Sequence, residues 1–303
     1  MARSDEALRF SWVLPEYRIL AVLQPKCASS SFLWGLSELA GNDPESRLRR
    51  SVIDTGTLDQ AIYDPWVHRL SALDAVAGSV RQEALRSPDW MRLGVTRDPY
   101  ARFYSAWENR VFLPYADAPA ALLEASHDVM VEGQLDLGAS FRAFVSRVMD
   151  EPRLLDLDHH FRTQVSCLAP SEIDYTDLVD VHGVGELGER IARRAGRPFS
   201  LPRANEGLGI SWRAMFDDKS ADWLERQYHE DFTEFGYERV DLPAEPAPQL
   251  LPELAVRLIT TVRQRDERIR AFAAEGRRSH LSRLAMISLR RRVREGLAGL
   301  RRV

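Results

Sequence analysis

Two short apolar segments, each running directly into a loop and then into an amphipathic segment, restrict the fold of this chain more than any other feature. Residues 18–24 (RILAVLQ) form a β-leaning run that stops at Pro25, and the small residues CASSS precede a helical pattern that ends near Gly41. Residues 92–96 (RLGVT) form the second run and lead into RDPYARFYSAW, whose apolar residues share one helical face. Strands that alternate with helices favour an α/β fold, a parallel sheet flanked by helices.

Further elements follow from the same periodicities. A third strand is predicted at 178–184, and helices are predicted at 68–85, 136–149, 186–195 and 217–235. A Pro-rich linker, 242–252, separates a predicted globular domain, 1–241, from a basic helical tail, 253–303. The expected architecture is therefore one α/β domain with a C-terminal basic helical extension.

Positive charge is concentrated in that tail. Residues 277–303 contain nine arginines and one acid, Glu295, a net charge of +8, and because the whole chain carries −4, residues 1–276 carry −12. An amphipathic basic tail suits an anionic membrane surface, the acidic body of the same chain, or a second copy in a homo-oligomer. Nucleic-acid binding is not expected, because no motif of that kind accompanies the charge.

Cysteine usage and the N-terminus bear on the compartment. The two cysteines, Cys27 and Cys167, are too few for a disulfide framework and indicate a reducing compartment. The first residues lack the basic start and apolar run of a signal peptide, and no stretch approaches the roughly 20 apolar residues of a membrane-spanning helix. We expect a cytoplasmic protein whose membrane contact, where it occurs, is peripheral.

The loop PKCASSS, residues 25–31, lies where a strand end meets a helix N-terminus. Such a junction presents unpaired backbone N–H groups and the positive end of the helix dipole. Small residues let an anion approach closely, three hydroxyls add donors, and Lys26 supplies a positive charge. The loop is a candidate phosphate or sulfate site, although an ordinary serine-rich helix cap has the same composition.

A second loop repeats this arrangement. Arg97 follows the second strand and Ser105 lies two turns into the next helix, where both are placed to bind a further anion. The planar guanidinium of arginine donates two hydrogen bonds to a phosphate at once. Two anion sites at the ends of neighbouring parallel strands indicate a nucleotide that carries phosphates at both ends.

These loops resemble those of the family 2, or carbohydrate, sulfotransferases. PKCASSS is similar to the family's 5′-phosphosulfate loop, P-K-x-[AG]-[ST]-x-S, and RDPYARFYSAW to its 3′-phosphate motif, R-D-P-x-x-R-x-x-S-A-[YWF]. Weaker matches follow in family order at 158–170 (DHHFRTQVSCLAP) and 224–237 (LERQYHEDFTEFGY). In LPRANEG, Gly207 replaces the family's hydroxyl residue. The resemblance covers 18–237 and implies a P-loop-like fold that uses no metal.

The resemblance also implies the co-substrate, 3′-phosphoadenosine 5′-phosphosulfate (PAPS), and its ligands. The residues that would hold the 5′-phosphosulfate are Lys26, Cys27, Ala28, Ser29, Ser30 and Ser31, the second and third through their backbone N–H groups. Lys26 would also stabilise the negative charge that develops on the bridging oxygen, and Arg97 and Ser105 would bind the 3′-phosphate. Arg102 either joins this site or anchors its helix to an acid. Arg162 and Gln164 contact donor or acceptor, or are surface residues.

An acceptor hydroxyl benefits from a proton acceptor, and histidine is the natural choice near neutral pH. His68 is the leading candidate, because PWVHRLSAL resembles the family's V-H-x-x-x-L segment; the alternative is a half-buried histidine at a helix start. His159 and His160 come next. On an extended segment their side chains would point to opposite sides, which makes them poor joint metal ligands.

Three functions fit these features. The first is a sulfotransferase that uses PAPS to sulfate a hydroxyl of a carbohydrate or glycolipid, with Lys26 and His68 as catalytic residues. The second is a small-molecule kinase of related fold, which the missing G-x-x-x-x-G-K-[ST] loop disfavours. The third is a non-catalytic module that binds anions and associates with a membrane, which the complete set of donor-site side chains disfavours.

Overall fold

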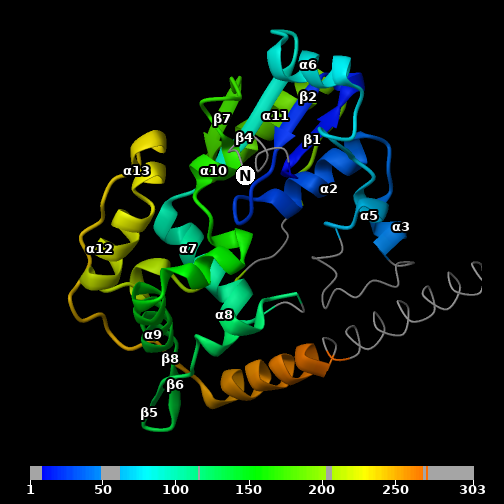
Figure 1. Cartoon of the computed structure of the whole chain (residues 1–303). Coiled ribbons are helices and arrows are strands. Elements are labelled where there is room, and N and C mark those ends of the chain that lie inside the picture. The colour runs from blue at the N-terminus through cyan, green and yellow to red at the C-terminus, as the bar shows by residue number, and fades with distance from the viewer. Residues whose placement is uncertain (1–8, 49–61, 115–116, 203–206, 269–270, 272–303) are drawn as a thin grey trace, which may run out of the picture.

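The computed structural model describes residues 9–48, 62–114, 117–202, 207–268 and 271, and its centre is a five-stranded sheet (Figure 1). In the order of the sheet, the strands are β3 (Ser71–Ala72), β1 (Ser11–Leu14), β2 (Ile19–Val22), β4 (Met91–Thr96) and β7 (Asp177–Asp180). The three predicted strands β2, β4 and β7 are parallel to one another, which confirms the α/β fold class.

An antiparallel edge, which the sequence did not predict, extends this parallel sheet. β1 pairs antiparallel with β2 and with β3. A short 3₁₀ turn, Pro15–Tyr17, followed by Arg18 in the left-handed conformation (φ 50°), reverses the chain between β1 and β2. The sheet is therefore mixed, with its parallel half carrying both predicted loops.

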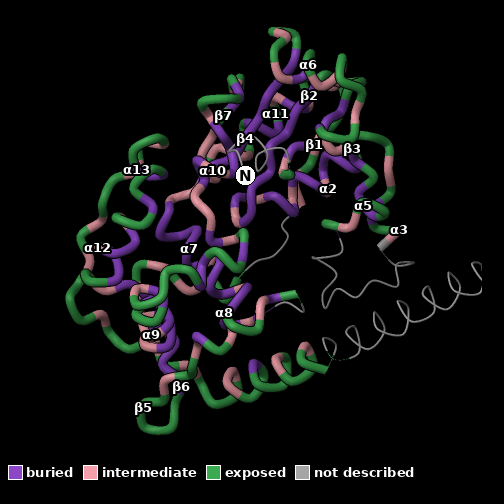
Figure 2. The backbone as a smooth tube through the Cα atoms, viewed as in Figure 1, coloured by how far each residue is buried: buried purple, intermediate pink, exposed green. Residues whose placement is uncertain are grey.

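Helices cover both faces of the sheet. On one face, alternate residues of β2 and β4 pack on α2 (Ser29–Leu39) and α11 (Val184–Ala195). On the other face, Leu20 and Val22 pack among residues of α6 (Gly78–Arg86) and α10 (Gln164–Leu168). Every residue of β2 and β4 is buried as a result, which accounts for the uninterrupted apolar run of β2 (Figure 2).

Several predicted helices are confirmed with small shifts in their ends. These are α2, α7 (Pro99–Trp107), α9 (Leu137–Asp150) and α11. Aspartate caps set two of the starts: Asp98 accepts from Ala101 N at 3.0 Å, and Asp136 accepts from Ala139 N at 3.1 Å. The remaining short elements are α3 (Pro44–Leu48), α8 (Ala120–Glu124), the π-helix Glu108–Phe112, and the 3₁₀ turns Pro152–Leu157, His159–Phe161, Val181–Gly183 and Trp212–Ala214.

The single helix predicted at 68–85 is wrong. The chain instead forms α5 (Pro65–His68), the edge strand β3, and α6. Asp64 caps α5 through Trp66 N at 2.7 Å, and Arg69 ends it in the left-handed conformation (φ 52°). The apolar spacing that mimicked one helix arises because the strand and α6 contribute to one apolar cluster, and because pairing with β1 outweighs local periodicity.

The helix predicted at 217–235 is two helices, α12 (Asp218–Gln227) and α13 (His229–Phe235). A capping box between Asp217 and Ser220 starts α12, and Gly236 in the left-handed conformation (φ 69°) ends α13. The break falls at Tyr228, whose hydroxyl donates to the carbonyl of Phe161. This tertiary hydrogen bond fixes the position of the break.

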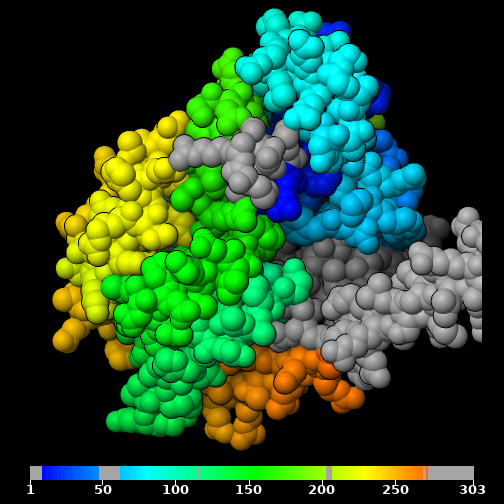
Figure 3. Space-filling model, in the orientation of Figure 1, coloured from blue at the N-terminus to red at the C-terminus, as the bar shows by residue number. Residues whose placement is uncertain are grey.

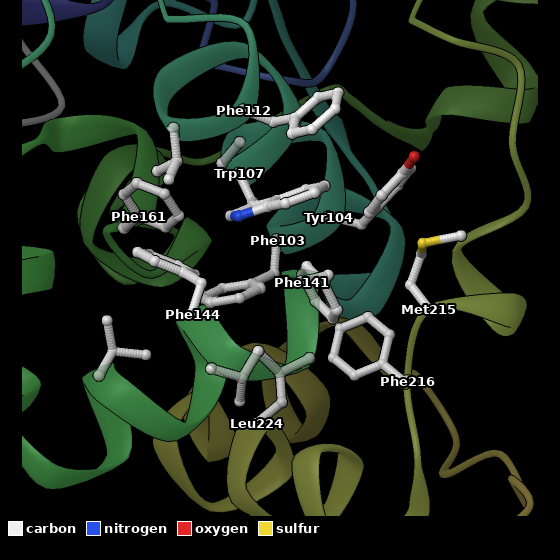
Figure 4. Close-up of a cluster of buried hydrophobic side chains, with 14 of the residues drawn as sticks. Phe103, Tyr104, Trp107, Phe112, Phe141, Phe144, Phe161, Met215, Phe216 and Leu224 are labelled. Atoms are coloured by element: carbon white, nitrogen blue, oxygen red, sulfur yellow. The ribbon is translucent and has the colours of Figure 1, made fainter. Parts of the chain in front are cut away.

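A second core, rich in aromatic rings, lies beside the sheet and supports α7 (Figure 4). Trp107 packs edge-on against Phe141, with ring centroids 5.2 Å apart, and Phe103 packs edge-on against Phe161 at 5.4 Å. Tyr100 stacks on Trp212 at 5.1 Å. Because α7 carries the second predicted loop at its N-terminus, this core fixes the position of that loop relative to the sheet.

The predicted linker and the start of the tail contact the body. β8 (Leu250–Leu251) pairs with β6 (Gln134–Asp136), which also pairs with β5 (Met130–Val131). A helix at 253–268 then lies along the segment that contains α8 (Figure 3), and its Ile259 is buried in the aromatic core. Residues 272–303 lie outside the described residues, so the role of the basic tail and the domain limits stay predictions. Among the described residues, no helix combines the length and apolar character needed to cross a bilayer.

Candidate active site

The loop between β2 and α2 has the backbone of an anion site. Lys26 and Ala28 both adopt the left-handed conformation, with φ of 68° and 58°. For residues with a Cβ atom this conformation costs roughly 1–2 kcal/mol, and two of the six such residues in the described part of the chain lie in this one loop. Ala28 is the N-cap residue of α2 and supplies no side-chain cap. The side chain of the N-cap residue therefore accepts no hydrogen bond from the first turn of α2, and the positive end of the helix dipole faces the loop.

The structure joins the two predicted loops directly. Arg97 donates from Nη1 to the carbonyl oxygen of Lys26 at 3.1 Å. Arg97 is half-buried at the end of β4, and Ser105 is half-buried six residues into α7. At 1.5 Å per residue Ser105 lies roughly 9 Å along the helix from Pro99. No hydrogen bond joins the two side chains within the described part of the chain, so their shared 3′-phosphate site stays a prediction.

Gln164 links the loops from beneath, and it is fully buried. Its Oε1 accepts from Gln24 Nε2 at 3.0 Å and from Arg97 N at 2.9 Å, and its Nε2 donates to Arg97 O at 2.8 Å. Asp231 in turn accepts from the backbone N–H groups of Gln164 and Val165, both at 2.9 Å. Gln164 therefore positions the loops and is too deeply buried to contact donor or acceptor as proposed from the sequence.

Arg102 is also structural. It is 2% exposed, and it donates from Nε to Pro25 O at 3.2 Å and from Nη1 to Arg162 O at 2.6 Å. Both partners are backbone carbonyl oxygens, whereas the partners predicted from the sequence were a phosphate of the donor or an acidic side chain. Arg102 thus holds the segment around residue 162 against the first loop.

Lys26 lies in a positively charged, half-buried environment. Its amino group contacts Asn109 Oδ1, and burial together with the Arg97 charge lowers its pKa to about 7, against the opposing effect of Glu108. Glu108 is 3% exposed and accepts from Leu208 N at 2.7 Å. A Cβ atom at residue 207 would overlap its carboxylate, so a larger residue at this position requires Glu108 to move.

A lowered pKa makes Lys26 chemically distinguishable from Lys219, the other lysine of the chain. At pH 7.5 most Lys26 amino groups should be neutral, whereas an exposed lysine with a pKa of about 10.4 is about 0.1% neutral. We therefore expect an amine-acylating reagent to modify Lys26 well ahead of Lys219 at pH 7.5, and the two at similar rates above pH 10. Mass spectrometry of the peptides measures both rates; equal rates at pH 7.5 would contradict the lowered pKa.

The small residues of the first loop occupy the expected places. Cys27 is buried, and burial raises the pKa of its thiol to about 12, so it is a protonated filler of space. Ser29 and Ser30 are buried in the first turn of α2, and Ser31 is half-buried. The hydroxyl of Tyr63 lies 2.7 Å from Ser29 Oγ and 2.8 Å from Ser30 Oγ, a contact that the sequence pattern did not indicate.

His68 does not have the placement that a base requires. Its side chain is fully buried, its Nδ1 accepts from Leu70 N at 2.9 Å, and its ring packs edge-on against Trp12 at 4.5 Å. Its carbonyl accepts from Ser37 Oγ, which is eight residues, or roughly 12 Å, along α2 from Ser29. Burial lowers the pKa of His68 to about 4, so its ring is neutral near pH 7, and it is the full burial of the ring that argues against a role as base. These contacts correct the prediction: His68 joins α5 to α2 and β1.

The other two histidine candidates lie beside a buried carboxylate. His159 and His160 occupy a 3₁₀ turn, and their ring centroids are 4.3 Å apart, so the expectation that they point to opposite sides is wrong. Asp158 accepts from His160 Nδ1 at 2.6 Å and from Arg110 Nε at 2.6 Å. Against burial, which acts to raise it, these partners hold the pKa of Asp158 below its usual range.

The cluster of Asp158, His159 and His160 is better suited to accept a proton than to bind a metal ion. The candidate ligand atoms of Asp158, His159 and His160 lie within 4.8 Å of one another. However, the Arg110 guanidinium already contacts the carboxylate, and its charge repels a metal ion. With Nδ1 held by Asp158, the neutral His160 ring carries its lone pair on Nε2. The His160 side chain is 17% exposed and its ring is oriented by the 2.6 Å contact with Asp158, whereas His159 Nδ1 lies 4.0 Å from that carboxylate, so His160 is the better-oriented candidate base.

Comparison with known proteins identifies the family of this chain. The model of the sulfotransferase family matches residues 10–238, from the start of β1 to just beyond α13. The match includes both loops, Gln164 and the Asp158–His160 segment. Searches of the curated proteins and of the solved structures each found no significant match. Because the family model spans more than half of the chain and both loops keep the expected geometry, the chain belongs to the sulfotransferase family.

Proposed function

We propose that this protein transfers a sulfuryl group from PAPS to a hydroxyl of a carbohydrate or glycolipid acceptor. The observation that carries the proposal is the contact between the two loops, Arg97 Nη1 to Lys26 O at 3.1 Å, beside the uncapped N-terminus of α2. This contact places the candidate anion site of the first loop next to the Arg97 guanidinium, which is suited to bind a second anion. PAPS carries anionic groups at both its 5′ and its 3′ position.

The residues of the first loop fit the phosphosulfate. The left-handed backbone at Lys26 and Ala28 turns successive N–H groups toward one point, and the helix dipole favours negative charge there. Lys26 is poised for the transfer step, because bringing a polyanion beside its amino group favours the protonated form. The protonated amine then stabilises the charge that the 5′-phosphate gains as the bridging S–O bond breaks.

We assign the proton transfer to the Asp158–His160 pair. The acceptor O–H proton passes to His160 Nε2 while the acceptor oxygen forms its bond to sulfur, and the phosphate oxygen leaves with the bonding electrons. Buried Asp158 keeps His160 in the required tautomer and stabilises the imidazolium that forms. Arg102 and the contact between Arg110 and Asp158 hold this segment beside the loop of Lys26.

The donor is tested by calorimetry with the product nucleotide, 3′-phosphoadenosine 5′-phosphate. It should bind in the absence of magnesium, and far more tightly than ATP, because Arg97 and the first loop match its two phosphates. Tight magnesium-dependent binding of ATP would instead favour a kinase. The acceptor is identified by incubating the protein with labelled PAPS and a panel of glycans, glycolipids and small alcohols; label on none of them would remove the proposed reaction.

Replacing Arg97 should reveal the 3′-phosphate contact. We expect Arg97→Ala to weaken binding of 3′-phosphoadenosine 5′-phosphate by about 1.5–3 kcal/mol, the scale of a hydrogen bond to a charged group. Affinity for adenosine 5′-phosphate, which lacks the 3′-phosphate, should barely change. Calorimetry with both ligands measures the difference. Equal losses for both would mean that Arg97 acts only by holding Lys26 O.

A further inference from the structure

Tyr63 contributes a third hydroxyl to the first turn of α2. Its Oη lies within hydrogen-bonding distance of both Ser29 Oγ, at 2.7 Å, and Ser30 Oγ, at 2.8 Å. The serines belong to the phosphosulfate loop, whereas Tyr63 precedes α5, more than thirty residues later in the chain. Its ring is 46% exposed, so the hydroxyl end is directed at the loop while the ring borders solvent.

The position of Tyr63 is set by rigid neighbours. Asp64 caps α5, and Pro65 follows as the first helical residue, so the backbone next to Tyr63 is fixed. α5 is in turn joined to α2, because Ser37 Oγ donates to His68 O at 2.8 Å and Asn42 Nδ2 donates to the same oxygen at 3.2 Å. The tyrosine therefore adjoins a helix that is bonded to the helix of the serines, which preorganises the cluster.

The three hydroxyl groups lie together at the first turn of α2, and each carries one hydrogen that it can donate. Burial raises the pKa of Tyr63, so its hydroxyl stays protonated and remains a donor. An oxygen with negative charge that approaches the N-terminus of α2 competes for these hydrogens, and hydrogen bonds to a charged oxygen are the stronger kind.

We propose that Tyr63 is a donor-binding residue whose hydroxyl bonds a non-bridging oxygen of the phosphosulfate group, together with Ser29 and Ser30. The proposal rests on the assignment of this loop to PAPS. The opposing arrangement is a plug, in which the Tyr63 hydroxyl occupies the anion position and must leave before the donor binds. The two arrangements predict opposite effects of removing the hydroxyl.

The test compares Tyr63→Phe with Tyr17→Phe. Tyr17 donates to Leu39 O at 3.3 Å, at the far end of the same helix, so this control also removes one hydroxyl from a contact with α2. Calorimetry without magnesium measures the affinity for 3′-phosphoadenosine 5′-phosphate, and steady-state assays measure kcat/KM for PAPS. We expect Tyr63→Phe to lower the nucleotide affinity, kcat/KM for PAPS, or both by about 10- to 100-fold, and Tyr17→Phe to change neither quantity.

Two results would overturn the proposal: tighter binding of the nucleotide by Tyr63→Phe, which indicates a plug, or values equal to those of the wild type. Melting temperatures of both variants, expected within a few degrees of the wild type, exclude misfolding as the cause of a loss. Failure of the proposed function is visible separately, because the unaltered protein would then bind neither the nucleotide nor pyrophosphate, a small analogue of the phosphosulfate group.

Discussion

Replacement of Lys26 by alanine is expected to lower kcat by about 10²–10³-fold, the effect of removing one preorganised group that stabilises charge in the transition state. Lys26 lies on the left-handed turn that leads into α2, and its amino group contacts Asn109; in the proposed reaction this amino group stabilises the charge that the leaving phosphate gains. Binding of 3′-phosphoadenosine 5′-phosphate should weaken less than tenfold, because the backbone N–H groups and Arg97 remain. Single-turnover kinetics and calorimetry measure the two quantities.

The chain offers a matched control for this variant. Lys219, in the first turn of α12, is exposed, so Lys219→Ala removes the same charge from the surface. It should leave both kcat and nucleotide affinity unchanged. Near-normal turnover by Lys26→Ala would exclude the amino group from the transfer step, and a large loss of nucleotide affinity would assign it to binding instead.

Replacement of His160 by glutamine should lower kcat by about 10²–10⁴-fold, the usual contribution of a positioned base, without changing nucleotide affinity. Burial lowers the pKa of His160 to about 3, although Asp158 acts in the opposite direction. A group with a lowered pKa is deprotonated, and hence active as a base, at all pH values above that pKa. We therefore expect kcat/KM to be insensitive to His160 titration near pH 6.5, with its acid limb well below that pH.

Two further histidine variants serve as controls. His159 lies in the same turn, but its Nδ1 is 4.0 Å from the Asp158 carboxylate, so His159→Gln should keep most of the activity. His68→Gln should lower thermal stability through its lost packing against Trp12, while the folded fraction keeps its turnover. If His159→Gln or His68→Gln abolished turnover and His160→Gln did not, the assignment of the base to the Asp158–His160 pair would be wrong.

The sequence alone determined the parts of this protein that depend on local chain geometry. β2 and β4 end at loops that open α2 and α7, and the predicted parallel arrangement of β2, β4 and β7 is observed. A buried strand, a tight loop of small residues and a helix start each leave a signature within a few residues. Those signatures were enough to locate Lys26 and Arg97 at one edge of the sheet and to identify the family.

The tertiary structure decided which side chains can act. The sequence pattern predicts a base at His68, but the folded chain buries its ring fully against Trp12 of β1, and Gln164, a predicted ligand residue, is bonded instead to Gln24 and Arg97. Tyr63 drew no attention in the sequence, yet it meets Ser29 and Ser30. A side chain's role depends on its access to solvent and on its partners, and the hydrogen-bond partners named here lie 33 to 140 residues away along the chain. Contacts over such separations form only when the sheet and its helices assemble, so no local pattern carries them.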